Sequence, residues 1–315
     1  MAIFLTNDDV RKLLPMSECI AVLDDLFRQE AAGLVENLPR RRLRFGDAAS
    51  SAGPAATLMG GVALGSHAYG VRHSAVTLLY NTDTGKLDAV LEPGTIAWIR
   101  TGAATGVAVK YMSRPDAAVV GIIGTGRQAV TQLEAVCAVR PLELVKVYSR
   151  NEEKRRQFAL DASERLGVEV VPVASSDECV LGSQIVIAIT NGREPVFDGK
   201  ALEPGTHVTA AGSNSWTKRE IDETAIKRAD LIVVDNLEQA KMECGELIWA
   251  AERGSLSWRR VVELHQIVGG QVDGFPSSDA ITLFESQGIG IEDVAASAYV
   301  LGKARAAGVG EELPF

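Results

Sequence analysis

A glycine-rich segment, residues 124–129, carries the clearest chemical signal in this sequence. It consists of Gly124, Thr125, Gly126, Arg127, Gln128 and Ala129. It directly follows a short apolar run and precedes a stretch with helical periodicity, residues 128–139. In that context Gly124 permits a tight turn, Gly126 lets the backbone approach a pyrophosphate, and Ala129 permits close packing of helix on strand. Backbone N–H groups at a helix start bind phosphate, so the segment predicts a dinucleotide cofactor.

The residues after the next apolar run indicate which dinucleotide binds. An NAD site usually has an acidic residue there that holds the ribose 2′-hydroxyl. This chain has Ser149, Arg150 and Asn151 instead, followed by Lys154. Hydroxyl and cationic groups suit a 2′-phosphate, so we predict NADP(H) in preference to NAD(H). The alternative is that Arg150 and Lys154 are solvated charges at a helix start. Thr190, after a later apolar run, is a further predicted cofactor contact.

A run of arginines in residues 39–45, Pro-Arg-Arg-Arg-Leu-Arg-Phe, points to an anionic substrate. Alternation along a strand places Arg41 on the same side as Leu43 and Phe45, which we expect to be the buried side. An arginine on an apolar face needs an anion, so Arg41 is the favoured member of the run. If the register is shifted by one residue, all these arginines lie on a solvated edge.

Two more arginines, Arg72 and Arg100, lie among apolar and small residues. Together with Arg41 they offer enough N–H donors to grip a carboxylate bidentately. The alternative for either is a structural ion pair with Glu92 or Asp88.

The composition excludes several classes of function. The chain has 315 residues, of which 46% are hydrophobic and 23% charged, which predicts a globular protein of two domains. A net charge of −9 argues against a nucleic-acid partner. No apolar stretch reaches the about 18 residues of a membrane span, no signal peptide is evident, and the four cysteines have no metal-ligand spacing. We therefore expect a cytoplasmic protein with no metal site and no membrane partner.

The elements that must position these residues change character near residue 115. Beyond it, short apolar runs alternate with helical stretches, which is typical of a doubly wound parallel sheet covered on both faces. Before it, helical and strand patterns are mixed. The patterns predict a helix over residues 6–34, strands over 39–45 and 70–80, and a helix over 101–112. Periodicity alone does not assign the last helix, residues 291–307, to either part.

The sequence resembles the ornithine cyclodeaminase/mu-crystallin family over nearly its whole length. The resemblance is carried by Pro39-Arg40-Arg41, Gly70-Val71-Arg72, Arg100-Thr101-Gly102-Ala103, residues 122–129, residues 210–214, Arg219-Glu220-Ile221-Asp222 and residues 284–288. It implies a Rossmann-type domain, residues 116–290, inserted in an α+β substrate-binding and dimerisation domain, residues 1–115 plus 291–315. It also implies a homodimer, and a substrate carboxylate held by Arg41 and Arg100.

Two positions depart from the pattern of the resemblance. Cyclodeaminases and alanine dehydrogenases of the family carry a lysine where this chain has Arg72, and an acidic residue where it has Asn214. Arginine stays protonated and an amide accepts no proton, so the several proton transfers of ornithine cyclisation are disfavoured. Reducing a preformed protonated imine asks only for orientation and a hydride. We expect Arg72 and Asn214 to be catalytic-site residues, with the proton supplied by solvent, His67 or His73.

These residues together predict an NADP(H)-dependent oxidoreductase acting on the C=N or C–N bond of a small 2-imino or 2-amino acid, of the ketimine reductase or amino-acid dehydrogenase type. One alternative is an ornithine cyclodeaminase-like deaminating cyclase. Another is a non-catalytic NADPH-dependent ligand-binding protein like mu-crystallin. The absent proton-transfer groups favour that last alternative, and the arginine set disfavours it.

Overall fold

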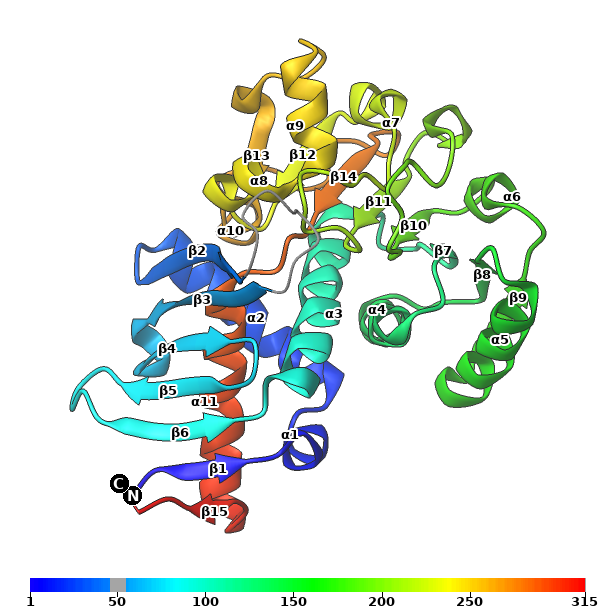
Figure 1. Ribbon diagram of the computed structural model, residues 1–315. Helices are drawn as coiled ribbons and strands as arrows, with labels where there is room; N and C mark the ends of the chain where they lie inside the picture. Colours follow the sequence, from blue (N-terminus) through cyan, green and yellow to red (C-terminus); the bar gives the residue numbers. More distant parts are fainter. Residues whose placement is uncertain (46–54, 315) are drawn as a thin grey trace. The chain divides into compact units, whose positions relative to one another are not determined.

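The computed structural model describes residues 1–45 and 55–314, which form two compact units (Figure 1). The terminal unit combines both ends of the chain, Met1–Arg100 and Ile289–Phe315, and the central unit is the continuous segment Thr101–Gly288. The division falls inside helix α3 (Pro93–Met112), whereas the sequence pattern placed a boundary at residue 115. The difference arises because this one helix begins in the terminal unit and ends in the central unit.

The central unit is built on a parallel sheet of eight strands in the order β13-β12-β14-β11-β10-β7-β8-β9. The strands are β7 (Val119–Ile123), β8 (Leu144–Tyr148), β9 (Glu169–Pro172), β10 (Ile185–Ala188), β11 (His207–Ala210), β12 (Leu231–Val234), β13 (Val261–Glu263) and β14 (Thr282–Glu285). Every residue of β10 and of β11 is buried. Strands buried on both sides need cover over both faces of the sheet, so the predicted doubly wound α/β fold is confirmed.

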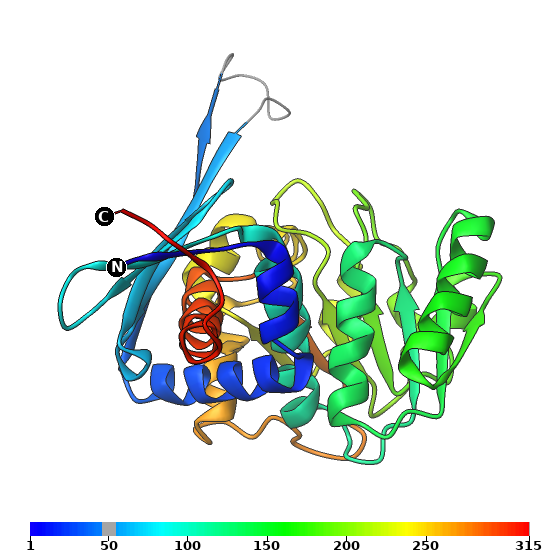
Figure 2. The same ribbon diagram turned by 90° about the horizontal axis from the view of Figure 1, so that it is seen from below.

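Helices flank this sheet, as Figure 2 shows for α4 and α5 beside the strands. The helices are α4 (Arg127–Val139), α5 (Glu152–Leu166), α6 (Ser176–Val180), α7 (Glu223–Arg228), α8 (Leu237–Glu243), α9 (Gly245–Glu252) and α10 (Leu264–Val268). Successive residues of β10 join different hydrophobic clusters: Ile185 and Ile187 pack in one, Val186 and Ala188 in the other. Successive strand residues point to opposite faces, so the unit has one core on each face of the sheet.

The terminal unit is built on a mixed sheet of seven strands in the order β15-β1-β6-β5-β4-β3-β2. The strands are β1 (Ile3–Leu5), β2 (Val35–Arg44), β3 (Ala55–Ala63), β4 (Ala68–His73), β5 (Thr77–Asn81), β6 (Leu87–Leu91) and β15 (Glu311–Glu312). Neighbours are antiparallel except β1 and β6, which are parallel. The first and last strands of the chain pair with each other, so both ends of the chain are fixed in this sheet.

Helix α11 (Gly290–Ala307) packs against β2, β3, β4 and β5 and against helix α2 (Met16–Ala31). It approaches β3 very closely at its start: a Cβ added to Gly290 would lie 2.2 Å from the backbone nitrogen of Gly60. Only glycine permits that approach. The Asn37 side chain accepts hydrogen bonds from the N–H groups of Gly290 and Ile291, at 3.1 and 3.4 Å. The first turn of α11 is therefore fixed against the sheet.

Several element boundaries differ from the predicted ones. Residues 6–34 form two helices, α1 (Asn7–Leu13) and α2, because Pro15 precedes α2 and interrupts the periodic pattern. Residues 70–80 form two antiparallel strands, β4 and β5, rather than one. No helix in the described part of the chain is long and apolar enough to cross a membrane.

Candidate active site

The glycine loop joins β7 to α4, which is the context that the sequence predicted. Gly124 has φ +120°, and a Cβ there would lie 2.2 Å from the carbonyl oxygen of Ile189. Gly124 therefore lets the ends of β7 and β10 approach each other. Gly126 is the N-cap of α4, and a Cβ on it would meet nothing within 4 Å. The backbone at this helix start is open to a ligand and no capping side chain competes for its N–H groups, so these residues fit a dinucleotide pyrophosphate.

The loop after β8 has well-defined local hydrogen bonds. The Asn151 side chain caps α5 by accepting from the N–H of Lys154 at 2.8 Å. The Ser149 hydroxyl donates to the carbonyl of Asn151 at 3.2 Å. Arg155, which the sequence reasoning missed, donates to the carbonyl of Ser149 at 2.8 Å. Arg150 and Lys154 are exposed. The loop is thus held in place while its two predicted phosphate ligands face solvent.

A buried carboxylate, Glu220, ties together the ends of β10 and β11. Its Oε1 accepts from the backbone N–H and the hydroxyl of Thr190, at 2.5 and 2.7 Å, and its Oε2 accepts from the N–H of Gly212 at 2.5 Å. Burial raises the pKa of Glu220, and these hydrogen bonds oppose that rise. The predicted contact Thr190 is therefore fixed by a residue that sequence reasoning did not single out. Asn214 is exposed in the loop that follows Gly212.

In the terminal unit, two arginines contact two acidic residues of α11, and a third arginine lies nearby. The Arg100 guanidinium contacts Glu292 at 2.7 Å and Asp293 at 3.3 Å, and Arg72 contacts Asp293 at 3.3 Å. Glu292, Asp293 and Arg100 are buried, and Arg72 is partly buried. We call Arg40, Arg72, Arg100, Glu292 and Asp293 the arginine cluster.

Met59 lies between two members of this cluster. Its sulfur accepts from Arg40 at 3.7 Å and from Arg72 at 3.9 Å. Met59 and Arg72 are paired across β3 and β4, so both side chains point to the same face of the sheet. Arg40 and Arg72 both donate to Met59, so two guanidinium groups lie near each other in a mostly buried site, and guanidinium N–H groups suit a small anion such as a carboxylate.

The predicted alternative partners of these arginines are wrong. Asp88 pairs with Arg305 at 2.8 Å, and Glu92 accepts from the N–H of Asn7 at 2.6 Å. The true partners, Glu292 and Asp293, are adjacent acids in the buried first turn of α11, and the residues that follow them are mostly small and apolar. That pattern was the available signal for a buried charge pair, because a carboxylate on a buried helix face needs a cation.

The predicted buried side of β2 is also wrong. Arg41, Leu43 and Phe45 are exposed, and Arg40 is the buried arginine of the run. The register between β2 and β3 shifts between Leu38 and Arg41, and Arg41 pairs with Leu58. The apolar residues misled the prediction because this end of the β2–β3 hairpin extends beyond the helices of its unit (Figure 2).

The histidines proposed as proton donors lie at opposite ends of β4. His67 has a left-handed backbone, φ 48°, and its exposed ring contacts Asp83 at 3.0 Å. His73 accepts from the N–H of Ala75 at 3.4 Å. His73 follows Arg72 directly on the strand, so its side chain points to the other face of the sheet. Neither position places an imidazole in the arginine cluster.

One group of described residues has the spacing of a metal site. One possible ligand atom from each of Cys244, Glu246 and Glu285 lies within 4.8 Å of the others, and all three are buried. Burial raises the pKa of Glu246 to about 7 and the pKa values of Cys244 and Glu285 well above their ordinary range. The Cys244 thiol donates to Glu246 at 3.8 Å, and Glu246 also accepts from the N–H of Glu220 at 2.6 Å, so Cys244 and Glu246 have hydrogen-bond partners within the protein and we propose no metal for this group.

Known proteins match this chain along its whole length. The model of the ornithine cyclodeaminase/mu-crystallin family matches residues 1–308. The chain belongs to the ornithine cyclodeaminase/mu-crystallin family. The predicted resemblance, which covered nearly the whole chain, is confirmed.

Relatives in this family carry the names of reductases and dehydrogenases. A Delta(1)-pyrroline-2-carboxylate reductase from Bacillus cereus is 33% identical, with 99% of each chain covered. An alanine dehydrogenase from Archaeoglobus fulgidus is also 33% identical, covering 99% of this chain and 98% of the relative. The structure of the Thermococcus litoralis Delta(1)-pyrroline-2-carboxylate reductase with NADH and L-proline superimposes with a TM-score of 0.93 at 32% identity, covering 99% of this chain and all of that chain. The prediction of an oxidoreductase of this family is confirmed at the level of enzyme class.

Proposed function

We propose that this enzyme is an NADP(H)-dependent reductase of the C=N bond in a small 2-imino acid, acting in the reverse direction as a dehydrogenase of the matching 2-amino acid. The arginine cluster is the observation that carries the proposal. Arg40 and Arg72 share Met59 as a contact, and neighbouring guanidinium groups in a mostly buried site suit a carboxylate because their paired N–H groups match its two oxygens. The structure of a similar relative is described in complex with L-proline, an amino acid that carries such a carboxylate.

We assign the substrate carboxylate to Arg40 and Arg72, with Arg100 held in position by Glu292 and Asp293. Arg40 takes the role that was predicted for Arg41, because Arg40 is 7% exposed and shares Met59 with Arg72. Arginine binds a carboxylate through two parallel N–H bonds. Such a clamp fixes the α-carbon of the acid, which is the carbon that reacts.

The chemistry left to the protein is orientation rather than proton transfer. The bound coenzyme supplies or accepts the hydride. The imine carbon of the substrate accepts that hydride, and the electron pair of the C=N bond moves to a nitrogen that already carries its proton. Arg72 and Asn214 suit this step because neither needs to act as a base. Asn214 donates a hydrogen bond to the substrate nitrogen or to the coenzyme amide in this proposal.

The proposed coenzyme is NADP(H). Gly124, Thr125, Gly126, Arg127 and Gln128 hold the pyrophosphate, and Ser149, Arg150, Asn151 and Lys154 surround the 2′-phosphate. The support is chemical: the loop after β8 offers a hydroxyl and exposed cations where a carboxylate would favour NAD(H). The archaeal alanine dehydrogenase structure, 29% identical with a TM-score of 0.91, holds NAD. The proposed preference for NADP(H) would therefore distinguish this chain from a relative of the same fold.

We also propose a homodimer formed through the terminal unit. Cross-strand pairing places Val71, Leu78, Val90 and Phe4 in one row on the sheet face opposite Met59 and Arg72, and all four are only partly buried in the single chain. The occupant that we propose for this apolar face is a second copy of the chain. The archaeal alanine dehydrogenase of similar structure is described as a dimer.

The four cysteines are free thiols, which supports the proposed cytoplasmic location.

The test is NADPH oxidation followed by absorbance. The substrates are pyrroline-2-carboxylate, iminosuccinate, and pyruvate with ammonia, with ammonia release from ornithine measured in parallel. We expect NADPH oxidation with at least one imino acid and none without it. Ammonia release from ornithine with no net change in NADPH would instead support the cyclodeaminase alternative. Tight NADPH binding without turnover on any of them would support a ligand-binding protein like mu-crystallin.

A further inference from the structure

Glu220 lies at the edge of the sheet where the coenzyme of a doubly wound fold binds. Ligands of such folds bind outside the carboxyl ends of the strands, where the strand order reverses. Here the order reverses between β7 and β10, and β11 is the next strand along. Thr190 and Gly212 follow the ends of β10 and β11, and both donate to the Glu220 carboxylate. One side chain therefore sets the spacing of two adjacent strand ends.

The geometry requires a carboxylate at this position. All the groups that contact its oxygens donate hydrogen bonds: two N–H groups and one hydroxyl. Both side-chain oxygens must therefore accept hydrogen bonds. A carboxylate has two acceptor oxygens, whereas an amide has one acceptor oxygen and one donor nitrogen. The close approach of the strands adds to this requirement, since a Cβ on Gly212 would lie 2.3 Å from the carbonyl oxygen of Thr190.

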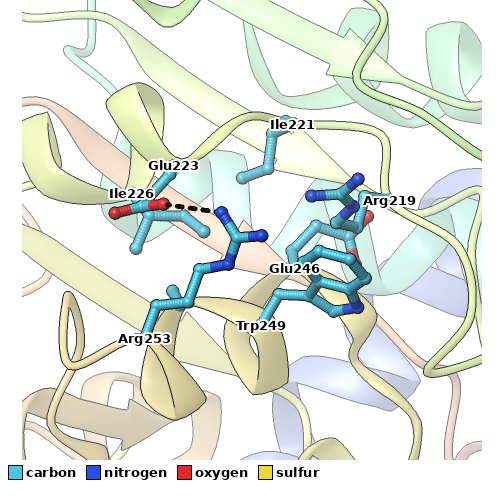
Figure 3. Close-up of a pocket in the computed structure, with 8 residues that line it drawn as sticks. Arg219, Ile221, Glu223, Ile226, Glu246, Trp249 and Arg253 are labelled. Carbon is cyan, nitrogen blue, oxygen red and sulfur yellow. Dashed lines mark ion pairs between the residues drawn. The ribbon is translucent and has the colours of Figure 1, made fainter.

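The backbone of Glu220 is itself held on both sides. Its N–H donates to Glu246 at 2.6 Å, and its carbonyl accepts from the N–H of Val196 at 2.8 Å. The flanking residues Arg219 and Ile221 line a surface pocket with Glu246 and Trp249 (Figure 3), where the Arg219 guanidinium lies 3.9 Å from the centre of the Trp249 ring. The segment is anchored before, at and after Glu220, so the carboxylate has little freedom to move.

We infer that Glu220 is a positioning residue for the nicotinamide end of the coenzyme, acting through Thr190 and Gly212; this inference rests on the proposed function. The glycine loop and the residues after β8 bind the other end. Removing the carboxylate therefore impairs placement of the nicotinamide and leaves recognition of the adenosine phosphates intact. A residue with only a structural role would weaken both together.

The test compares Glu220→Gln with Glu223→Gln, the same change made three residues on at a side chain that pairs with Lys227 and Arg253. We expect Glu220→Gln to lower kcat about tenfold or more, or to weaken NADPH binding by a similar factor, because the amide repels one of its former donors. Binding of 2′,5′-ADP, which has no nicotinamide, stays within about twofold of the parent. Glu223→Gln changes neither.

A second pair of variants keeps the inference open to test if Glu220→Gln does not fold. Thr190→Ser keeps the hydroxyl that donates to Glu220 and Thr190→Val removes it, so we expect kcat to fall further in the valine variant than in the serine variant. Equal losses of NADPH and 2′,5′-ADP binding, or unchanged kcat together with unchanged NADPH binding in both Glu220→Gln and Thr190→Val, overturn the inference. If the parent protein turns over no imine, the two binding measurements still decide the role of Glu220, which separates this inference from the proposed function.

Discussion

Arg100 on α3 and Glu292 on α11 form a buried ion pair with 2.7 Å between guanidinium and carboxylate, although 192 residues separate them in the chain. Both side chains are less than 5% exposed. Removing one member of a buried pair leaves its partner without compensation, which costs more than the pair contributes when intact. The pair therefore joins the folding of the terminal unit to the geometry of the proposed clamp.

Glu292→Gln is expected to destabilise the protein by about 3 kcal/mol, measured as the loss in unfolding free energy in urea. The reason is that Arg100 keeps its charge in a site from which water is excluded. Glu18→Gln is the matched control, because Glu18 joins α2 to α11 through Tyr299 and Lys303 but is 38% exposed. Its expected cost is below about 1 kcal/mol. Equal costs for the two variants would contradict the importance given to burial.

Arg40→Ala is expected to lower kcat/KM for the imino acid by roughly 10- to 100-fold, the effect of losing about 1.5–3 kcal/mol of charged hydrogen bonding. Arg41→Ala is the adjacent control, since Arg41 is exposed and pairs with Leu58 on the other face. Steady-state kinetics at saturating NADPH measures both. A large loss of kcat/KM in Arg41→Ala with a small loss in Arg40→Ala would instead assign the substrate carboxylate to Arg41, as first predicted.

Arg150→Asp is expected to reverse the coenzyme preference. The new carboxylate repels a 2′-phosphate and accepts from a 2′-hydroxyl, so kcat/KM should fall for NADPH and rise for NADH. A change of roughly tenfold or more in the ratio is expected. Arg156→Asp, a change of the same charge on the exposed face of α5 where Arg156 pairs with Glu152, should leave the ratio nearly unchanged. A parent enzyme that already prefers NADH would contradict the assignment.

His207 is expected to make the protein less stable in mild acid. Burial lowers the pKa of His207 from 6.5 to about 3, and its ring hydrogen-bonds to Thr282 and Thr209 at 2.8 and 3.0 Å. Below pH 6.5 the unfolded chain binds a proton that the folded chain does not, so stability falls by up to about 1.4 kcal/mol per pH unit. Urea unfolding from pH 7 to pH 5 should show a shallower dependence in His207→Gln, and an unchanged slope would refute this cause.

Leu78→Arg is expected to convert a dimer into a monomer. Leu78 lies in the middle of the apolar row, paired with Val71 on one side and Val90 on the other, so an arginine there places a charge in the proposed interface. Light scattering after size-exclusion chromatography measures the change. Leu160→Arg, at an exposed position of α5, is the control and should leave the molar mass unchanged. A parent protein that is monomeric in this measurement would contradict the proposed dimer interface.

Short-range features of this chain were predictable from the sequence. The glycine loop at residues 124–129 lies where the pattern placed it, between β7 and α4, because turn geometry and helix starts depend on adjacent residues. The alternation of apolar runs and helical stretches was sufficient to predict the doubly wound sheet, because the periodicity of a strand or a helix is likewise set by neighbouring residues.

Features set by distant partners were not predictable in the same way. The buried side of β2 depends on which part of the hairpin α11 covers, and alternation gives the two sides without saying which one is covered. Glu292 and Asp293 are far in sequence from Arg72 and Arg100, so no local pattern pairs them. Glu220 lies in a segment between elements, and its role appears only when the ends of β10 and β11 come together.

The division of the chain into a continuous central unit and a terminal unit made from both ends has a consequence for protein synthesis. The strands of residues 3–91 are translated before α11, so they lack Glu292 and Asp293 until residues 290–307 have been made. Residues 101–288 meet no such delay, because everything they need is contiguous. During translation, residues 1–100 therefore cannot complete their packing until α11 has been made, because Arg72 and Arg100 still lack its carboxylates. The central unit can fold before that point.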